Sequence, residues 1–122
     1  MKSVLIAEDD KFLASAYKVK LSKQNLGVTV VSDGVEAMNF LQENIPDLVI
    51  LDLVMPKKDG FTVLKEMKAD EKLKGIPVVV ASNLGQKEDI DKARQFGADD
   101  YIVKTDLSMK ELIQKINHLI AS

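Results

Sequence analysis

The sequence contains no cysteine and no tryptophan, and it has only three prolines among 122 residues. Without cysteine, neither a disulfide framework nor a thiolate metal site can form. No apolar stretch approaches the roughly 20 residues that a membrane-spanning helix needs. Met1 and Lys2 lead directly into an apolar, strand-like run, a start that does not match a signal peptide. We therefore expect a protein of the cytoplasm that does not associate with a membrane.

Neither sign of charge predominates, because 17 Lys and Arg residues face 19 Asp and Glu residues for a net charge of -2. This balance argues against broad electrostatic binding of nucleic acid or anionic membrane. The 46% hydrophobic and 30% charged residues are typical of an ordinary globular protein. A chain of this length can bury a core of its own, so we expect one domain over residues 1–122 with no direct contact to nucleic acid.

Five short apolar runs alternate with segments of helical period. The runs lie at residues 4–7, 28–31, 48–51, 76–81 and 101–103. Uninterrupted Val, Ile and Leu residues are typical of strands that are buried on both faces of a parallel sheet. The alternation with helical segments predicts an α/β domain of three layers.

Polar side chains suited to phosphoryl transfer directly follow four of these runs. They are Glu8, Asp9 and Asp10 after the first run, Asp52 after the third, Ser82 after the fourth and Lys104 after the fifth. Ligand sites of parallel sheets lie beyond the carboxyl ends of the strands. The sequence therefore predicts one site that combines carboxylates, a hydroxyl and an ammonium group.

The carboxylates of this predicted site suit magnesium, which prefers a few oxygen ligands and keeps several waters. Asp9 and Asp52 would bind Mg²⁺ directly, with Glu8 or Asp10 acting through water. An acidic triplet by itself would equally well cap and solubilise a helix. Asp52 changes this interpretation, because an acid opposite the triplet adds repulsion that only a bound cation would relieve. Asp52 is also the candidate nucleophile, since a carboxylate can attack phosphorus to form an aspartyl-phosphate.

Together these motifs resemble the receiver domain of two-component response regulators, whose smallest members are the single-domain chemotaxis regulators. The resemblance spans nearly the whole chain. It rests on Glu-Asp-Asp after the first run, D-x-x-M-P-x-x-D-G from Asp52, the hydroxyl of Ser82, and G-A-D-D-Y-I-V-K at 97–104. It implies a flavodoxin-like three-layer sandwich with five helices and a five-stranded parallel sheet of order 2-1-3-4-5.

The resemblance also implies roles for the residues of the site. Asp52 would accept a phosphoryl group from a phosphohistidine donor, and Lys104 would pair with Asp52 beforehand. Glu8 and Asp9 match the acidic pair of the metal site, with Asp52 and the backbone carbonyl of Val54 as further ligands of Mg²⁺. The protein would catalyse its own phosphorylation and a slow dephosphorylation, without being an enzyme that turns over a separate substrate.

Ser82 and Tyr101 match a switch in which a hydroxyl and an aromatic ring respond together to phosphorylation. The surface formed by the fourth helix, fifth strand and fifth helix would then bind a downstream effector protein or a fused output domain. The phosphodonor would be a sensor histidine kinase or a phosphotransfer protein, in contact with the first helix near Phe12 and Ala16.

The chain departs from the family at several positions. Thr105 replaces the proline that usually follows the lysine, so we expect a trans peptide bond and a differently shaped loop. Asn83 replaces a small residue beside the switch hydroxyl and would slow phosphoryl entry or contact the phosphoryl oxygens itself. Val54 and Leu84 occupy positions that help to orient hydrolytic water in relatives. Because neither side chain forms hydrogen bonds, we expect a slowly hydrolysed aspartyl-phosphate.

Two other functions are compatible with parts of the sequence. A pseudo-receiver that acts as a phosphorylation-independent interaction module is favoured by Thr105 and Asn83 and opposed by the intact acidic site. A phosphatase with an aspartate nucleophile would carry a second acid two residues after it to protonate the leaving group. Val54 stands there instead, which argues against repeated hydrolysis of a substrate.

Overall fold

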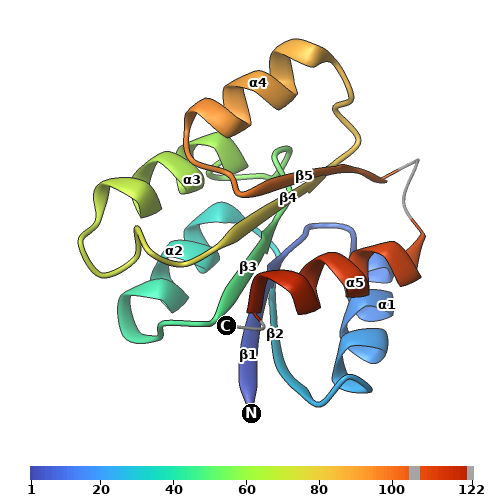
Figure 1. Cartoon of the computed structure of the whole chain (residues 1–122). Coiled ribbons are helices and arrows are strands. Elements are labelled where there is room, and N and C mark those ends of the chain that lie inside the picture. Colours follow the sequence, from blue (N-terminus) through green and yellow to red (C-terminus); the bar gives the residue numbers. More distant parts are fainter. Residues whose placement is uncertain (105–107, 121–122) are drawn as a thin grey trace.

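The computed structural model describes residues 1–104 and 108–120, in which strands and helices alternate (Figure 1). The five strands form one parallel sheet in the order β2-β1-β3-β4-β5, as expected. The elements are β1 (Lys2–Ala7), α1 (Lys11–Ser22), β2 (Leu26–Val31), α2 (Gly34–Glu43), β3 (Leu48–Leu51), α3 (Gly60–Ala69), β4 (Val78–Ser82), α4 (Lys87–Gln95), β5 (Asp100–Val103) and α5 (Met109–Ile120).

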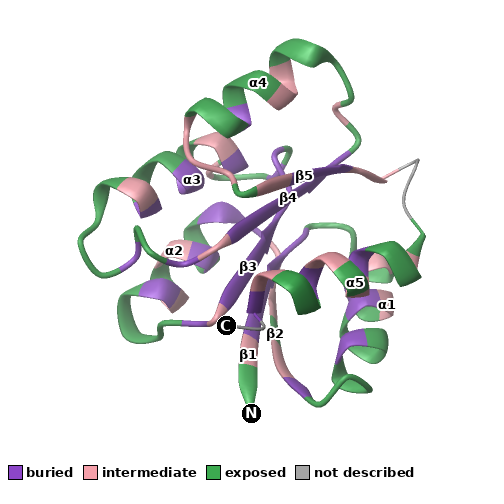
Figure 2. Cartoon of the chain, viewed as in Figure 1, coloured by how far each residue is buried: buried purple, intermediate pink, exposed green. Residues whose placement is uncertain are grey.

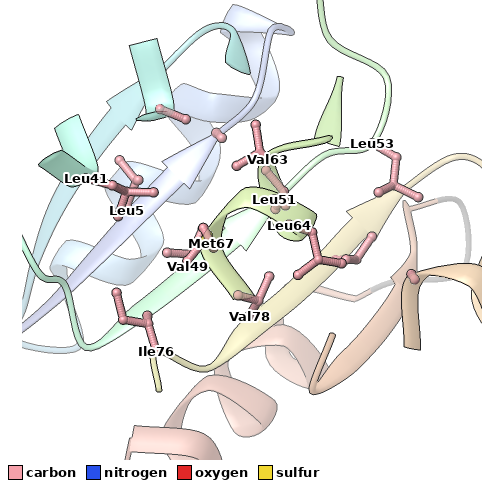
Figure 3. Packing of buried hydrophobic residues seen from close by; sticks show 14 of the residues in the cluster. Leu5, Leu41, Val49, Leu51, Leu53, Val63, Leu64, Met67, Ile76 and Val78 are labelled. Carbon is pink, nitrogen blue, oxygen red and sulfur yellow. The ribbon is translucent and has the colours of Figure 1, made fainter. Parts of the chain in front are cut away.

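Two apolar clusters, one on each face of the sheet, hold the three layers together. The larger joins α2, α3 and α4 to one face, and it contains Leu5, Val49 and Val78 of the strands together with Leu41 and Leu64 of the helices (Figure 3). The smaller cluster joins α1 and α5 to the opposite face. Successive strand residues point to opposite faces, so both faces can be apolar only where a strand is apolar without interruption. β3 and β4 are accordingly buried along their whole length, and β1 is buried from Val4 to Ala7 (Figure 2).

The strand boundaries differ from the sequence prediction where the backbone or the pairing decides them. β3 covers the predicted residues 48–51. β4 begins only at Val78, because Pro77 has no N–H to donate to the sheet. β2 begins earlier than predicted, at Leu26, since Gly27 pairs with Ser3 of β1. None of the helices within residues 1–104 and 108–120 is long and apolar enough to cross a membrane.

Candidate functional site

Four strands deliver the predicted side chains to a single cavity of about 360 Å³ at the carboxyl end of the sheet. β1 leads to Glu8, β3 to Asp52 and β5 to Lys104, whereas Ser82 is itself the last residue of β4. The cavity is lined by Glu8, Asp9, Asp10, Leu13, Asp52, Val54, Ser82, Asn83 and Lys104. Leu13 is the member that sequence reasoning missed, although its place three residues after Asp10 could have revealed it.

Three of the predicted carboxylates form an acidic cluster that could hold a metal ion. Glu8, Asp9 and Asp52 each offer an oxygen atom, and these atoms all lie within 4.8 Å of one another. Glu8 and Asp52 are buried, with 3% and 5% of their surface exposed, while Asp9 is exposed. Asp10 instead caps α1, because its side chain accepts a hydrogen bond from the N–H of Leu13 at 3.0 Å.

Lys104 lies between the two buried carboxylates. Its Nζ is 2.9 Å from Oδ2 of Asp52 and also forms an ion pair with Glu8. Only 10% of the Lys104 side chain is exposed. Among the described residues that line the cavity, Lys104 is the one cation facing the carboxylates of Glu8, Asp9 and Asp52. The cluster is therefore left with excess negative charge that a divalent cation could neutralise.

Burial and neighbouring charges shift the pKa of two groups in this cluster. Burial raises the pKa of Glu8 to about 7, and the charge of Asp52 acts in the same direction, although hydrogen bonds from Lys104 and the Asp10 N–H oppose the rise. For Lys104, burial lowers the pKa, but its bonds to Glu8 and Asp52 outweigh burial, so the net pKa is raised. The ammonium thus stays charged, whereas Glu8 exchanges its proton close to neutral pH.

The two predicted switch residues hold the same segment of backbone. Ser82 is fully buried, and its Oγ accepts a hydrogen bond from the N–H of Leu84 at 3.2 Å. The hydroxyl of Tyr101 donates to the carbonyl of the same residue, Leu84. Tyr101 is 9% exposed and does not line the cavity. The backbone of Leu84 therefore connects Ser82, which lines the cavity, to Tyr101 in β5. Because only backbone atoms of Leu84 take part, its residue type did not indicate this role.

Other predicted positions lie around the cavity or outside the described residues. Asn83 lines the cavity and is exposed. Phe12, in the first turn of α1, is 88% exposed, and Ala16 is half-buried. The predictions about Thr105, its peptide bond and its loop lie outside the described residues.

Comparisons with known proteins identify the same family along nearly the whole chain. The model of the response regulator receiver domain matches residues 4–117. The DNA-binding dual master transcriptional regulator RpaA of Synechocystis is 32% identical over 120 residues, which cover 98% of this chain and 49% of that protein. The chain spans about half the length of the curated relatives it matches, at 45%, 49% and 48% of the first three.

Solved structures agree with this family. The receiver domain of the Francisella response regulator 1452 superposes with a TM-score of 0.92 at 33% identity, covering 99% of this chain and 98% of that one. The Mn²⁺-bound form of the response regulator Rcp1 superposes with a TM-score of 0.82 at 31% identity, covering 98% and 91%. The comparisons support the response regulator interpretation and not the pseudo-receiver alternative. The chain belongs to the response regulator receiver domain family.

Proposed function

We propose that Asp52 accepts a phosphoryl group from a phosphohistidine donor. The observation that carries this proposal is the position of Asp52 at the end of β3, where its carboxylate is 2.9 Å from the Lys104 ammonium and beside two further acids. A carboxylate oxygen of Asp52 forms a bond to phosphorus while the phosphorus–nitrogen bond of the donor breaks. The electron pair of that bond remains on the donor imidazole, which takes up a proton.

The acidic cluster fits Mg²⁺ as the cofactor of this transfer. Glu8, Asp9 and Asp52, together with the backbone carbonyl of Val54, would hold the ion. When bound, Mg²⁺ neutralises charge on the transferred phosphoryl oxygens. Support comes from the carboxylates that outnumber the ammonium group in the cavity and from the Mn²⁺ bound by the related regulator Rcp1. Lys104 keeps its charge throughout and turns from the Asp52 carboxylate to the phosphoryl group.

Phosphorylation would change the output surface through Ser82 and Tyr101. The Ser82 hydroxyl would donate its proton to a phosphoryl oxygen, while its Oγ accepts a hydrogen bond from the Leu84 N–H. The Leu84 carbonyl accepts a hydrogen bond from the Tyr101 hydroxyl, so Ser82 and Tyr101 are linked through the backbone of one residue. Phosphorylation then shifts the population between two arrangements of the surface formed by α4, β5 and α5.

The partners follow from this chemistry. We infer that this protein acts in the cytoplasm and receives its phosphoryl group from a sensor histidine kinase or a phosphotransfer protein. A downstream effector protein or a fused output domain would bind the α4-β5-α5 surface. Residues 1–122 would act as a single receiver domain. The protein would promote its own phosphorylation and slow dephosphorylation but would not turn over a separate substrate.

Intact mass spectrometry tests the proposal directly. After incubation with Mg²⁺ and a small acyl phosphate or a phosphohistidine donor, the wild type should gain one phosphoryl group. The gain should disappear in Asp52→Ala and when Mg²⁺ is chelated. Asp91→Ala, which makes the same change at an exposed site on α4, is the matched control and should be modified normally. A wild type that gains no mass from either donor, or an Asp52→Ala variant that still does, would refute the proposal.

The aspartyl-phosphate is expected to hydrolyse slowly once formed. Val54 lines the cavity and is 58% exposed, so a water molecule there finds an apolar side chain instead of a hydrogen-bonding group. After removal of the donor, most molecules should remain phosphorylated for minutes in a time course of intact mass. Val54→Asn, which supplies an amide at the same place, should shorten the lifetime. Loss of the phosphoryl group from the wild type within seconds, without a phosphatase, would contradict this expectation.

A further inference from the structure

The loop between β3 and α3 follows Asp52 and contains Val54, which lines the acidic cavity. Its two ends are joined to each other, because the Gly60 N–H at the start of α3 donates to the Leu53 carbonyl at 2.9 Å. Gly60 also packs so closely on the β3 end that an added Cβ would lie 2.1 Å from the carbonyl oxygen of Asp52. Any displacement of the loop between these joined ends therefore has to be absorbed by residues 54–58.

The start of α2 lies against this loop at Lys58, two residues before α3 begins, although the two segments are distant in sequence. A Cβ added to Gly34 would lie 2.0 Å from the carbonyl oxygen of Lys58 and 2.7 Å from its carbonyl carbon and Cβ. Just beside it, Lys57 has the left-handed φ of 67°. Its Nζ is 3.4 Å from Oδ2 of Asp33. The loop thus contacts the side chain of Asp33 and the backbone of Gly34, two consecutive residues that we call the Asp33-Gly34 step.

The Asp33-Gly34 step is itself held in place. Asp33 is buried and caps α2, because its Oδ1 accepts a hydrogen bond from the N–H of Glu36 at 2.8 Å. Glu36 in turn accepts a bond from the Ser32 N–H at 3.0 Å. These reciprocal bonds fix the helix start against the end of β2, in the manner of a capping box. When a side chain is added to Gly34, the Lys58 backbone is therefore the part that must move.

We propose that the Asp33-Gly34 step is a positioning element for the metal site: the missing side chain of Gly34 sets the place of the β3–α3 loop, and hence of the Val54 carbonyl. The inference rests on the proposed function, because it takes Val54 as a ligand of Mg²⁺. Mg²⁺ demands nearly ideal octahedral geometry, so a displaced carbonyl weakens binding although every carboxylate is retained. Groups that position metal ligands commonly change metal affinity by about 10-fold to 100-fold when mutated.

Isothermal titration calorimetry with Mg²⁺ alone tests the inference on the full chain. Gly34→Ala should raise the dissociation constant about tenfold or more while the stoichiometry stays close to that of the wild type. Gly75→Ala is the matched control, since a Cβ there meets nothing within 4 Å, and it should bind like the wild type. A purely structural role would instead lower the thermal stability and the bound fraction while leaving the dissociation constant of the folded molecules unchanged.

Phosphorylation kinetics give a second readout. In Gly34→Ala, the Mg²⁺ concentration for half-maximal phosphorylation of Asp52 should rise by the same factor as the dissociation constant, while the rate at saturating Mg²⁺ approaches that of the wild type. A folded Gly34→Ala protein with wild-type Mg²⁺ affinity overturns the inference, and so does an equal loss in Gly75→Ala.

A second variant tests the inference in case Gly34→Ala does not fold. Lys57→Gly suits the positive φ but removes the pairing with Asp33 and loosens the loop. It should weaken Mg²⁺ binding, although by less than the roughly tenfold expected of Gly34→Ala. If Gly34→Ala is unfolded, an unchanged affinity in Lys57→Gly overturns the inference. Failure of the wild type to bind Mg²⁺ would instead refute the metal site of the proposed function, and the inference with it.

Discussion

Replacing Lys104 with methionine is expected to slow phosphorylation of Asp52 about 100-fold or more, because a preorganised charge that meets the transferred oxygens would be lost. The same change should tighten Mg²⁺ binding. In the wild type, the ammonium is 2.9 Å from Asp52 and pairs with Glu8, so it neutralises the carboxylates that would hold the ion. The rate constant from intact mass and the Mg²⁺ dissociation constant from calorimetry should therefore both fall, because the reaction is slowed while the ion is bound more tightly.

The same variant should be less stable when Mg²⁺ is absent. Its two buried carboxylates lose their cation, and breaking a buried ion pair by removing one partner typically costs about 3 kcal/mol or more. Mg²⁺ should restore part of this loss in thermal unfolding.

Lys115→Met is the matched control: Lys115 is also 2.9 Å from a carboxylate, that of Asp100, but its side chain is 41% exposed. Lys115→Met should cost less than about 1 kcal/mol and leave phosphorylation unchanged. Tighter Mg²⁺ binding and normal phosphorylation in Lys104→Met together would contradict the assigned role.

Mg²⁺ affinity is expected to fall about tenfold between pH 8 and pH 6, because Glu8 has to lose its proton before it can serve as a ligand. Burial raises the pKa of this carboxyl to about 7, so most molecules carry a charged Glu8 at pH 8 and a protonated one at pH 6. Titration of Mg²⁺ by calorimetry across this range measures the effect. Glu8→Gln should weaken binding and remove the pH dependence.

The raised pKa of Glu8 also has a consequence for folding without metal. A carboxyl whose pKa in the folded protein is above its ordinary value of 4.5 stabilises the fold in its protonated form. The contribution is fully present below pH 4.5 and is lost as the pH rises through about 7. In chelator, the wild type should therefore lose stability relative to Glu8→Gln between pH 5 and pH 8. Glu43→Gln, an exposed change on α2, should follow the wild type. An Mg²⁺ affinity that does not depend on pH would contradict the first expectation, and a wild type whose stability in chelator follows that of Glu8→Gln between pH 5 and pH 8 would contradict the second.

Much of the fold was predictable because its signals are local. The apolar run at 48–51 became β3 without adjustment, since a strand buried on both faces leaves no room for polar side chains. The boundary of β4 was less predictable, because Pro77 interrupts the donation of hydrogen bonds and only the pairing with β3 and β5 fixes where the strand begins. The strand order came from the resemblance to receiver domains and is confirmed by the structure.

The sequence by itself determined which chemical groups reach the site, because a polar residue at the end of a buried strand lies at the carboxyl edge of the sheet. Only the tertiary structure decided how these groups differ. It buries Glu8 against Lys104 while leaving Asp9 exposed, and it directs Asp10 to cap α1. It also brings Gly34 against Lys58. The reason is physical. Composition and the spacing of apolar residues are properties of neighbouring positions in the sequence, whereas burial, pKa shifts and close backbone contacts depend on atoms that are distant in sequence.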